Sequence, residues 1–135
     1  MKRLACCVLA FGFWTAWSSA SLADTHGCAC VHNEVPQQIS FRYKFGDGSW
    51  KNVKLPPGFN DAICWRYGGG KHSSPNLRFE LDVDMTKGKA WTVYSLERVQ
   101  TPGDTCKVVP ANGHYSIKYR PGTNKQFIRV YKKGS

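Results

Sequence analysis

The hydrophobic positions of this chain repeat mainly with a period of two. Residues 39–45, 77–83 and 115–119 each alternate apolar with polar side chains. Such alternation is typical of β-strands that pack one face against a core and expose the other. Turn sequences rich in Gly and Pro separate the runs. The pattern predicts about seven strands, at residues 38–45, 49–55, 61–67, 77–84, 90–99, 114–120 and 125–132.

Short strands at this spacing predict an all-β fold, namely one antiparallel β-sandwich of the immunoglobulin-like type or a related Greek-key or barrel type. Residues 61–67 and 90–99 carry apolar side chains on both faces. We therefore expect these two strands in the middle of a sheet or covered on both sides. Residues 24–34 are expected to form a polar leader ahead of the first strand.

The turn sequences also predict the register of two hairpins. A three-residue loop at 46–48 places Ile39 opposite Leu55 and keeps one face of the hairpin apolar. It also places Lys44 across from Trp50. In the last hairpin, a turn at 121–124 pairs Ile117 with Ile128 and Tyr115 with Val130.

The N-terminus has the pattern of a cleavable secretory signal. Lys2 and Arg3 precede an apolar run at residues 4–17, and Ser21 and Ala23 are small residues ahead of polar Asp24. The apolar run is shorter than the roughly 20 residues of a membrane-spanning helix. We therefore expect residues 1–23 to be a signal peptide and residues 24–135 to be a single secreted or periplasmic domain.

Four cysteines lie beyond the predicted signal, at Cys28, Cys30, Cys64 and Cys106. An even number in a small exported domain indicates two disulfides. A bond between Cys28 and Cys30 would close a very tight ring. We expect these two to pair separately with Cys64 and Cys106, in either arrangement. Because oxidised cysteines are not thiolate ligands, the segment from His26 to His32 predicts no metal site, and no cofactor is expected.

The net charge is strongly positive. The chain has 19 Lys and Arg against 9 Asp and Glu, and loss of Lys2 and Arg3 would leave 17 basic residues and a charge of +8. Such a charge favours anionic partners, namely an acidic polysaccharide, lipopolysaccharide or nucleic acid. The hairpin registers gather cations and aromatic rings that could bind such a polymer. The candidate binding residues are Arg42, Lys44, Trp50, Lys118, Arg120, Phe127, Arg129 and Tyr131.

The sequence thus predicts a disulfide-stabilised binding module rather than an enzyme, since no catalytic motif is present. One alternative is an inhibitor or immunity-type protein that presents loop 68–76 to a protein partner. The other is a small hydrolase or nuclease that uses His72 and His114 as acid and base. The acidic row of Glu80, Asp82 and Asp84 is expected to pair with Arg or Lys across strands.

Overall fold

The computed structural model of this chain describes residues 23–68, 72–86 and 90–133. Its regular structure is nearly all β. Two short 3₁₀ turns, η1 (Cys106–Val108) and η2 (Ala111–Gly113), precede β8, and no helix among the described residues is long and apolar enough to cross a membrane. The strands are β1 (His26–Asn33), β2 (Ile39–Phe45), β3 (Lys51–Leu55), β4 (Asn60–Arg66), β5 (Leu77–Asp82), β6 (Trp91–Tyr94), β7 (Val99–Thr101), β8 (His114–Tyr119) and β9 (Ile128–Lys132).

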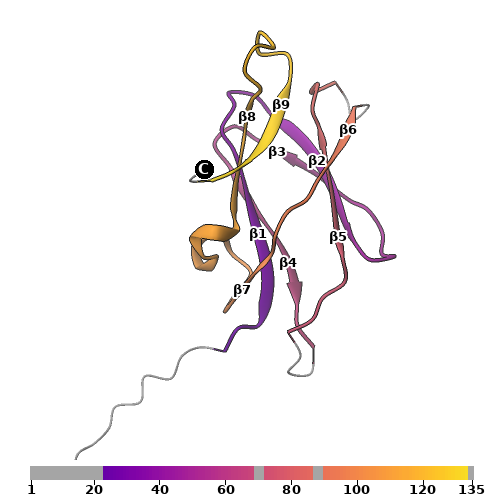
Figure 1. Cartoon of the computed structure of the whole chain (residues 1–135), viewed down its shortest axis with the longest axis vertical. Helices are drawn as coiled ribbons and strands as arrows, with labels where there is room; N and C mark the ends of the chain where they lie inside the picture. The colour runs from indigo at the N-terminus through magenta and orange to yellow at the C-terminus, as the bar shows by residue number, and fades with distance from the viewer. Residues whose placement is uncertain (1–22, 69–71, 87–89, 134–135) are drawn as a thin grey trace, which may run out of the picture.

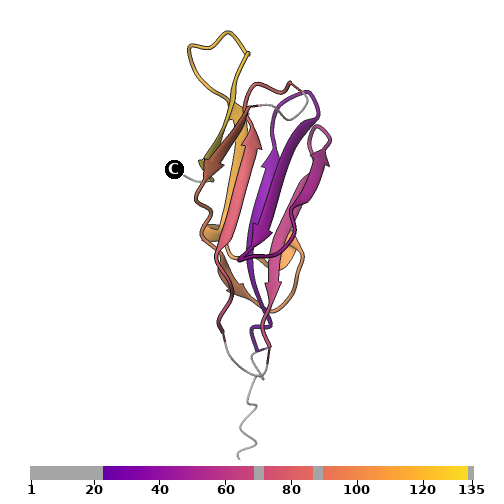
Figure 2. The ribbon, with the colours of Figure 1, turned by 90° about the vertical axis from the view of Figure 1, so that its right-hand side faces the viewer.

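The strands form two sheets that pack as the layers of a sandwich (Figures 1 and 2). Sheet A has the order β4-β1-β8-β9, with β7 also beside β1, and sheet B has the order β3-β2-β5-β6. The predicted all-β sandwich is therefore confirmed. The strand pairs are antiparallel except for β1 and β8, which are parallel.

The main core lies between the sheets. Alternate residues of β2, β5, β1 and β8 fill it, which explains the period of two in the sequence. The largest fully buried apolar side chains are Phe41, Phe79, Ile39, Ile63, Leu81, Ile117, Ile128 and Val31.

A second, smaller core lies on the outer face of sheet A. Cys28 and Cys30 alternate along β1 with residues of the main core, so they face away from it and pack with Val109. The disulfides are Cys28–Cys64 and Cys30–Cys106. The prediction that Cys28 and Cys30 pair separately is confirmed, and the bonds indicate an oxidising, extracellular or periplasmic environment.

Two expectations about the strands were wrong. Residues 24–34 are not a polar leader, because β1 is a central strand in which positions 28–31 are fully buried. Cys28 and Cys30 are bonded in disulfides, so their side chains pack as apolar groups in this strand. Residues 90–99 are not one strand, because 91–94 form β6 in sheet B, 95–98 are in no strand and Val99 begins β7 in sheet A. Both β4 and β6 are edge strands. β4 nevertheless fits the alternative that it is covered on both sides, because Cys64 on its second face is bonded to Cys28 and packs against the smaller core.

The first hairpin has the predicted register, with Ile39 opposite Leu55. The predicted register of the last hairpin was wrong by two residues, because Ile117 pairs with Val130. The connection is longer than a four-residue turn: the amide of Arg120 donates to the carbonyl of Phe127 at 2.8 Å. Since the slip is an even number of residues, each side chain keeps its face.

Candidate functional site

The eight side chains of the predicted basic-aromatic surface fall into two groups in the structure. Arg42, Lys44 and Trp50 lie on or beside β2 and β3 of sheet B. The remaining five lie on β8, β9 and their connection in sheet A, and they are Lys118, Arg120, Phe127, Arg129 and Tyr131. The two groups have different surroundings and therefore different chemistry.

The sheet B group is a stack that we call the tryptophan–arginine stack, made of Trp50, Arg42 and Trp91. The guanidinium carbon of Arg42 lies 4.3 Å from the ring centroid of Trp50 and 4.6 Å from that of Trp91. Its Nη2 lies 2.6 Å from Oε2 of Glu80, the cross-strand neighbour on β5. Arg78 Nε donates to the other Glu80 oxygen at 3.0 Å. Both arginines of this region therefore have a carboxylate partner within the protein.

Glu80 is the electrostatic centre of this stack. Its side chain is only 5% exposed. Burial raises the pKa of this carboxyl, but hydrogen bonds from Arg42 and Arg78 and their positive charges outweigh burial and bring the pKa below its usual value. Glu80 therefore stays ionised at neutral pH and balances the cations beside it. The expected pairing of this acidic residue with Arg is confirmed.

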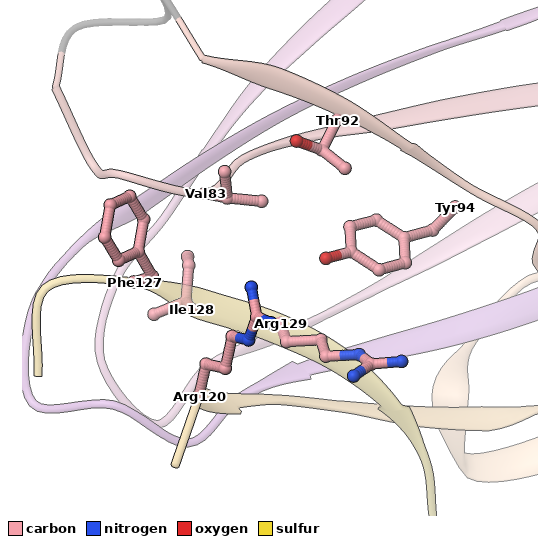
Figure 3. A pocket seen from close by; sticks show the side chains of 7 residues that line it. All are labelled: Val83, Thr92, Tyr94, Arg120, Phe127, Ile128 and Arg129. Atoms are coloured by element: carbon pink, nitrogen blue, oxygen red, sulfur yellow. The ribbon is translucent and has the colours of Figure 1, made fainter. Parts of the chain in front are cut away.

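The sheet A group contributes to a cavity that we call the edge groove. The cavity has a volume of about 240 Å³. Figure 3 shows Thr92 and Tyr94 on the wall formed by β6, with Phe127 and Arg129 on the facing wall and Arg120 beside them. The lining residues are Val83, Thr92, Tyr94, Arg120, Phe127, Ile128 and Arg129.

The edge groove forms because β6 and β9 are the last strands of their sheets and lie side by side across the sandwich. The amide of Ile128 at the start of β9 donates to the carbonyl of Val83, which directly follows β5, at 2.9 Å and links the two sheets near the groove. Thr92 lies opposite Leu81 and Tyr94 opposite Phe79, so both share the core-facing side of sheet B. Tyr94 packs against the margin of the main core and also lines the groove.

The arginines of the edge groove lack the balance found in the tryptophan–arginine stack. Within the described part of the chain, no carboxylate forms an ion pair with Arg120 or Arg129. Burial raises the pKa of the Tyr94 phenol, while the charges of Arg129 and Arg120 act to lower it. Tyr94 is consequently a neutral hydroxyl donor near two uncompensated cations. This combination suits an anionic group.

The other predicted residues of sheet A lie outside the groove lining. Lys118 Nζ is 3.7 Å from Oε2 of Glu34, so this cation already has a partner. The guanidinium carbon of Arg129 lies 5.7 Å from the ring centroid of Tyr131. Phe127, which does line the groove, is 39% exposed and forms its open rim.

His72 and His114, which would be the acid and base of a hydrolase or nuclease, contact different residues. The His72 ring lies 5.1 Å from the Tyr67 ring, whereas His114 Nδ1 lies 2.8 Å from Nε2 of His32. The two cavities lined by His114 are also lined by His32 and not by His72. In loop 68–76, positions 69–71 lie outside the described residues.

Sequence reasoning missed Tyr94, Thr92 and Trp91, three residues that decide the chemistry of these surfaces. They were missed because residues 90–99 were predicted to be one central strand. The alternation of Trp91 and Val93 with Thr92 and Tyr94 was the available signal, since it separates an outer face from an inner one.

Comparison with known proteins adds no assignment to this geometry. No protein-family model, curated protein or solved structure matches the chain.

Proposed function

We propose that the protein is a small exported binding module that holds anionic groups of a polymer in the edge groove. The observation that carries this proposal is the pair Arg120 and Arg129, which line an aromatic cavity without a carboxylate partner among the described residues. Arginine binds phosphate, sulfate and carboxylate through two parallel hydrogen bonds, which a lysine does not provide.

The dimensions of the groove favour part of a polymer over a whole small molecule. Pockets for drug-sized ligands have volumes of roughly 300–1,000 Å³, whereas the edge groove measures about 240 Å³. One charged group with the ring that carries it fits this size. The rest of an anionic polysaccharide, lipopolysaccharide or nucleic acid would extend along the exposed cations outside.

The aromatic side chains supply the second component of recognition. Phe127 at the rim can stack on a sugar or a base, and Tyr94 can donate a hydrogen bond inside the groove. Base–aromatic contacts contribute about 1–3 kcal/mol each where bases are the ligand. Part of the affinity should therefore persist when salt screens the charges.

The proposed setting is outside the cytoplasm. The signal pattern at residues 1–23 supports secretion, and the two disulfides agree with an oxidising compartment. Purified exported protein is expected to begin at Asp24, and intact mass spectrometry tests that start. A retained N-terminus would contradict the signal assignment.

The test is the binding of heparin, lipopolysaccharide and single-stranded DNA, measured by titration calorimetry across a salt series. The test variant is Arg120→Gln/Arg129→Gln. The matched control is Lys54→Gln/Arg66→Gln, which removes two exposed cations from β3 and β4 and has the same net charge.

We expect the groove variant to lose at least about tenfold in affinity and its salt slope for single-stranded DNA to fall by about 1.4, at about 0.7 for each lost phosphate contact. The control should lose much less. Equal losses in both variants would mean that only net charge matters, and no polyanion binding at low salt would overturn the proposal.

A further inference from the structure

A second cluster of reactive side chains lies on the outer face of sheet A, away from the edge groove. Cys30 Sγ is 3.4 Å from His32 Nε2, and this nitrogen is 2.8 Å from His114 Nδ1. One donor atom from each of the three residues lies within 4.8 Å of the others. Cys106, which is bonded to Cys30, lines the same surface cavity as both histidines.

The strands hold these donors in place. β1 and β8 are parallel neighbours, with Cys30 directly opposite His114, and His32 follows on the same face of β1. A Cβ atom at Gly113 would lie 2.6 Å from Val99 Cγ2 and 2.7 Å from Val109 Cγ1. Gly113, the residue before His114, therefore has no room for a side chain.

The hydrogen bonds of His114 leave a suitable lone pair facing the cluster. His114 Nε2 lies 2.8 Å from the carbonyl oxygen of Val109. A carbonyl only accepts, so Nε2 carries the proton and Nδ1 is the unprotonated nitrogen that faces His32. A backbone carbonyl behind one ring nitrogen is the usual arrangement for a histidine whose other nitrogen binds a metal.

The donor spacing agrees with a tetrahedral metal centre. Zinc binds sulfur at about 2.3 Å and nitrogen at about 2.0 Å, which places S and N roughly 3.5 Å apart and two nitrogens roughly 3.3 Å apart. The corresponding distances are 3.4 Å and 2.8 Å, and all three donor atoms lie within 4.8 Å of one another, so the side chains must shift to enclose an ion.

We propose that Cys30, Cys106, His32 and His114 form a site for a thiophilic metal ion such as Zn²⁺, which opens when the Cys30–Cys106 disulfide is reduced. A dithiol supplies two electrons and two protons, becomes a disulfide itself and leaves two thiols on the protein. The metal ion then displaces the two thiol protons, the Nε2 proton of His32 moves to its Nδ1, and both thiolates bind the ion beside the two imidazoles. The disulfide and the metal ion are thus alternative occupants of one position.

The first test compares two variants that both lack the Cys30–Cys106 bond. Cys106→Ala keeps the Cys30 thiol beside the two histidines, whereas Cys30→Ala/Cys106→Ala has no thiol there. Both keep Cys28–Cys64, and circular dichroism checks their folding. Zn²⁺ affinity is measured by competition with a chromophoric chelator, and Co²⁺ provides a thiolate charge-transfer band.

We expect Cys106→Ala to bind one Zn²⁺ at least about 100-fold more tightly than the double variant, since even outer-shell changes alter metal affinity about 10–100-fold. Adding His114→Ala should abolish the gain. Equal affinity of the two variants, or no effect of His114→Ala, would overturn the proposal.

A second measurement needs no variant. Wild-type protein is reduced with a phosphine, which donates electrons without binding zinc as a dithiol does, and is then alkylated with and without Zn²⁺. Zinc should protect Cys30 and Cys106 while Cys28 and Cys64 react. Equal labelling of all four cysteines, read by peptide mass spectrometry, would contradict the site.

Discussion

The tryptophan–arginine stack and the edge groove are built from the same residue types, yet the charges of their arginines are balanced differently. In the stack, Arg42 lies between two indole rings and is 2.6 Å from the buried carboxylate of Glu80. In the edge groove, Arg120 and Arg129 lie beside Tyr94 and Phe127 with no carboxylate paired to them among the described residues. The stack has completed its interactions internally, whereas the groove leaves donors for a ligand.

The difference teaches that an Arg–aromatic pattern does not by itself identify a binding surface. What decides is whether a residue from a neighbouring strand neutralises the arginine. Glu80 on β5 lies directly opposite Arg42 on β2 and neutralises it. At the edge groove, β6 contributes Thr92 and Tyr94, which are neutral donors.

The largest effect that separates the two regions is expected from Glu80→Gln. It leaves Arg42 and Arg78 without their charged acceptor, and we expect a loss of about 2 kcal/mol in the free energy of unfolding. Chemical denaturation measures it. Glu97→Gln is the control, because Glu97 is exposed and pairs with Lys132 at the surface, so its loss should stay below about 0.5 kcal/mol. Similar losses for both would mean that the stack is ordinary surface.

The same carboxylate predicts a pH dependence. Because the folded-state pKa of Glu80 is lowered, its stabilisation is full above the unfolded value near 4.5 and is lost as pH falls through the lower folded-state pKa. The stability difference between wild type and Glu80→Gln should therefore shrink below about pH 4.5. Urea titrations from pH 7 to pH 3 test this, and a constant difference would contradict the assigned pKa.

A smaller effect is expected from Trp50→Leu. This change removes one ring of the stack and its contact with Lys44, whose Nζ lies 5.0 Å from the ring centroid. Cation–π contacts at partly exposed sites contribute about 0.5–1 kcal/mol each. We expect a stability loss of about 1 kcal/mol with unchanged polyanion affinity. A fall in affinity would extend the binding surface onto sheet B.

The smallest effect is expected from Tyr94→Phe in the edge groove. One neutral hydrogen bond contributes about 0.5–1.5 kcal/mol, so the affinity for the polymer should fall about threefold. Stability should change little, because the aromatic ring and its packing contacts are retained. Calorimetric titration against heparin measures the change, and unchanged affinity would place the anion elsewhere on the molecule.

Local pattern was sufficient for the fold class and for one hairpin. The alternation at Ile39, Phe41 and Tyr43 predicts both the strand and its core face, and loop 46–48 predicts its register. The last hairpin was misplaced because Asn124 and Lys125 adopt positive φ and lengthen the turn, which their residue types do not require. Because the register error was two residues, each side chain of the last hairpin was still assigned to the correct face of the sheet.

The candidate site was predicted only in part, because it is made by strands far apart in the sequence. Arg120, Phe127 and Arg129 were identified from one hairpin. Tyr94 could not be placed beside them, since nothing local shows that β6 and β9 meet at the open edge. The contact of His32 with His114 was likewise not predictable, because it depends on the parallel pairing of β1 and β8.

The most direct test of the contrast is the heparin affinity of two single variants, Arg42→Gln and Arg129→Gln, measured at one low salt concentration. Each removes one arginine charge, so net charge is matched. We expect Arg129→Gln to bind heparin several-fold more weakly than wild type, and Arg42→Gln to bind heparin as tightly as wild type under conditions in which this variant is folded. An equal loss of affinity in both variants, or a loss confined to Arg42→Gln, would contradict the proposed role of the edge groove.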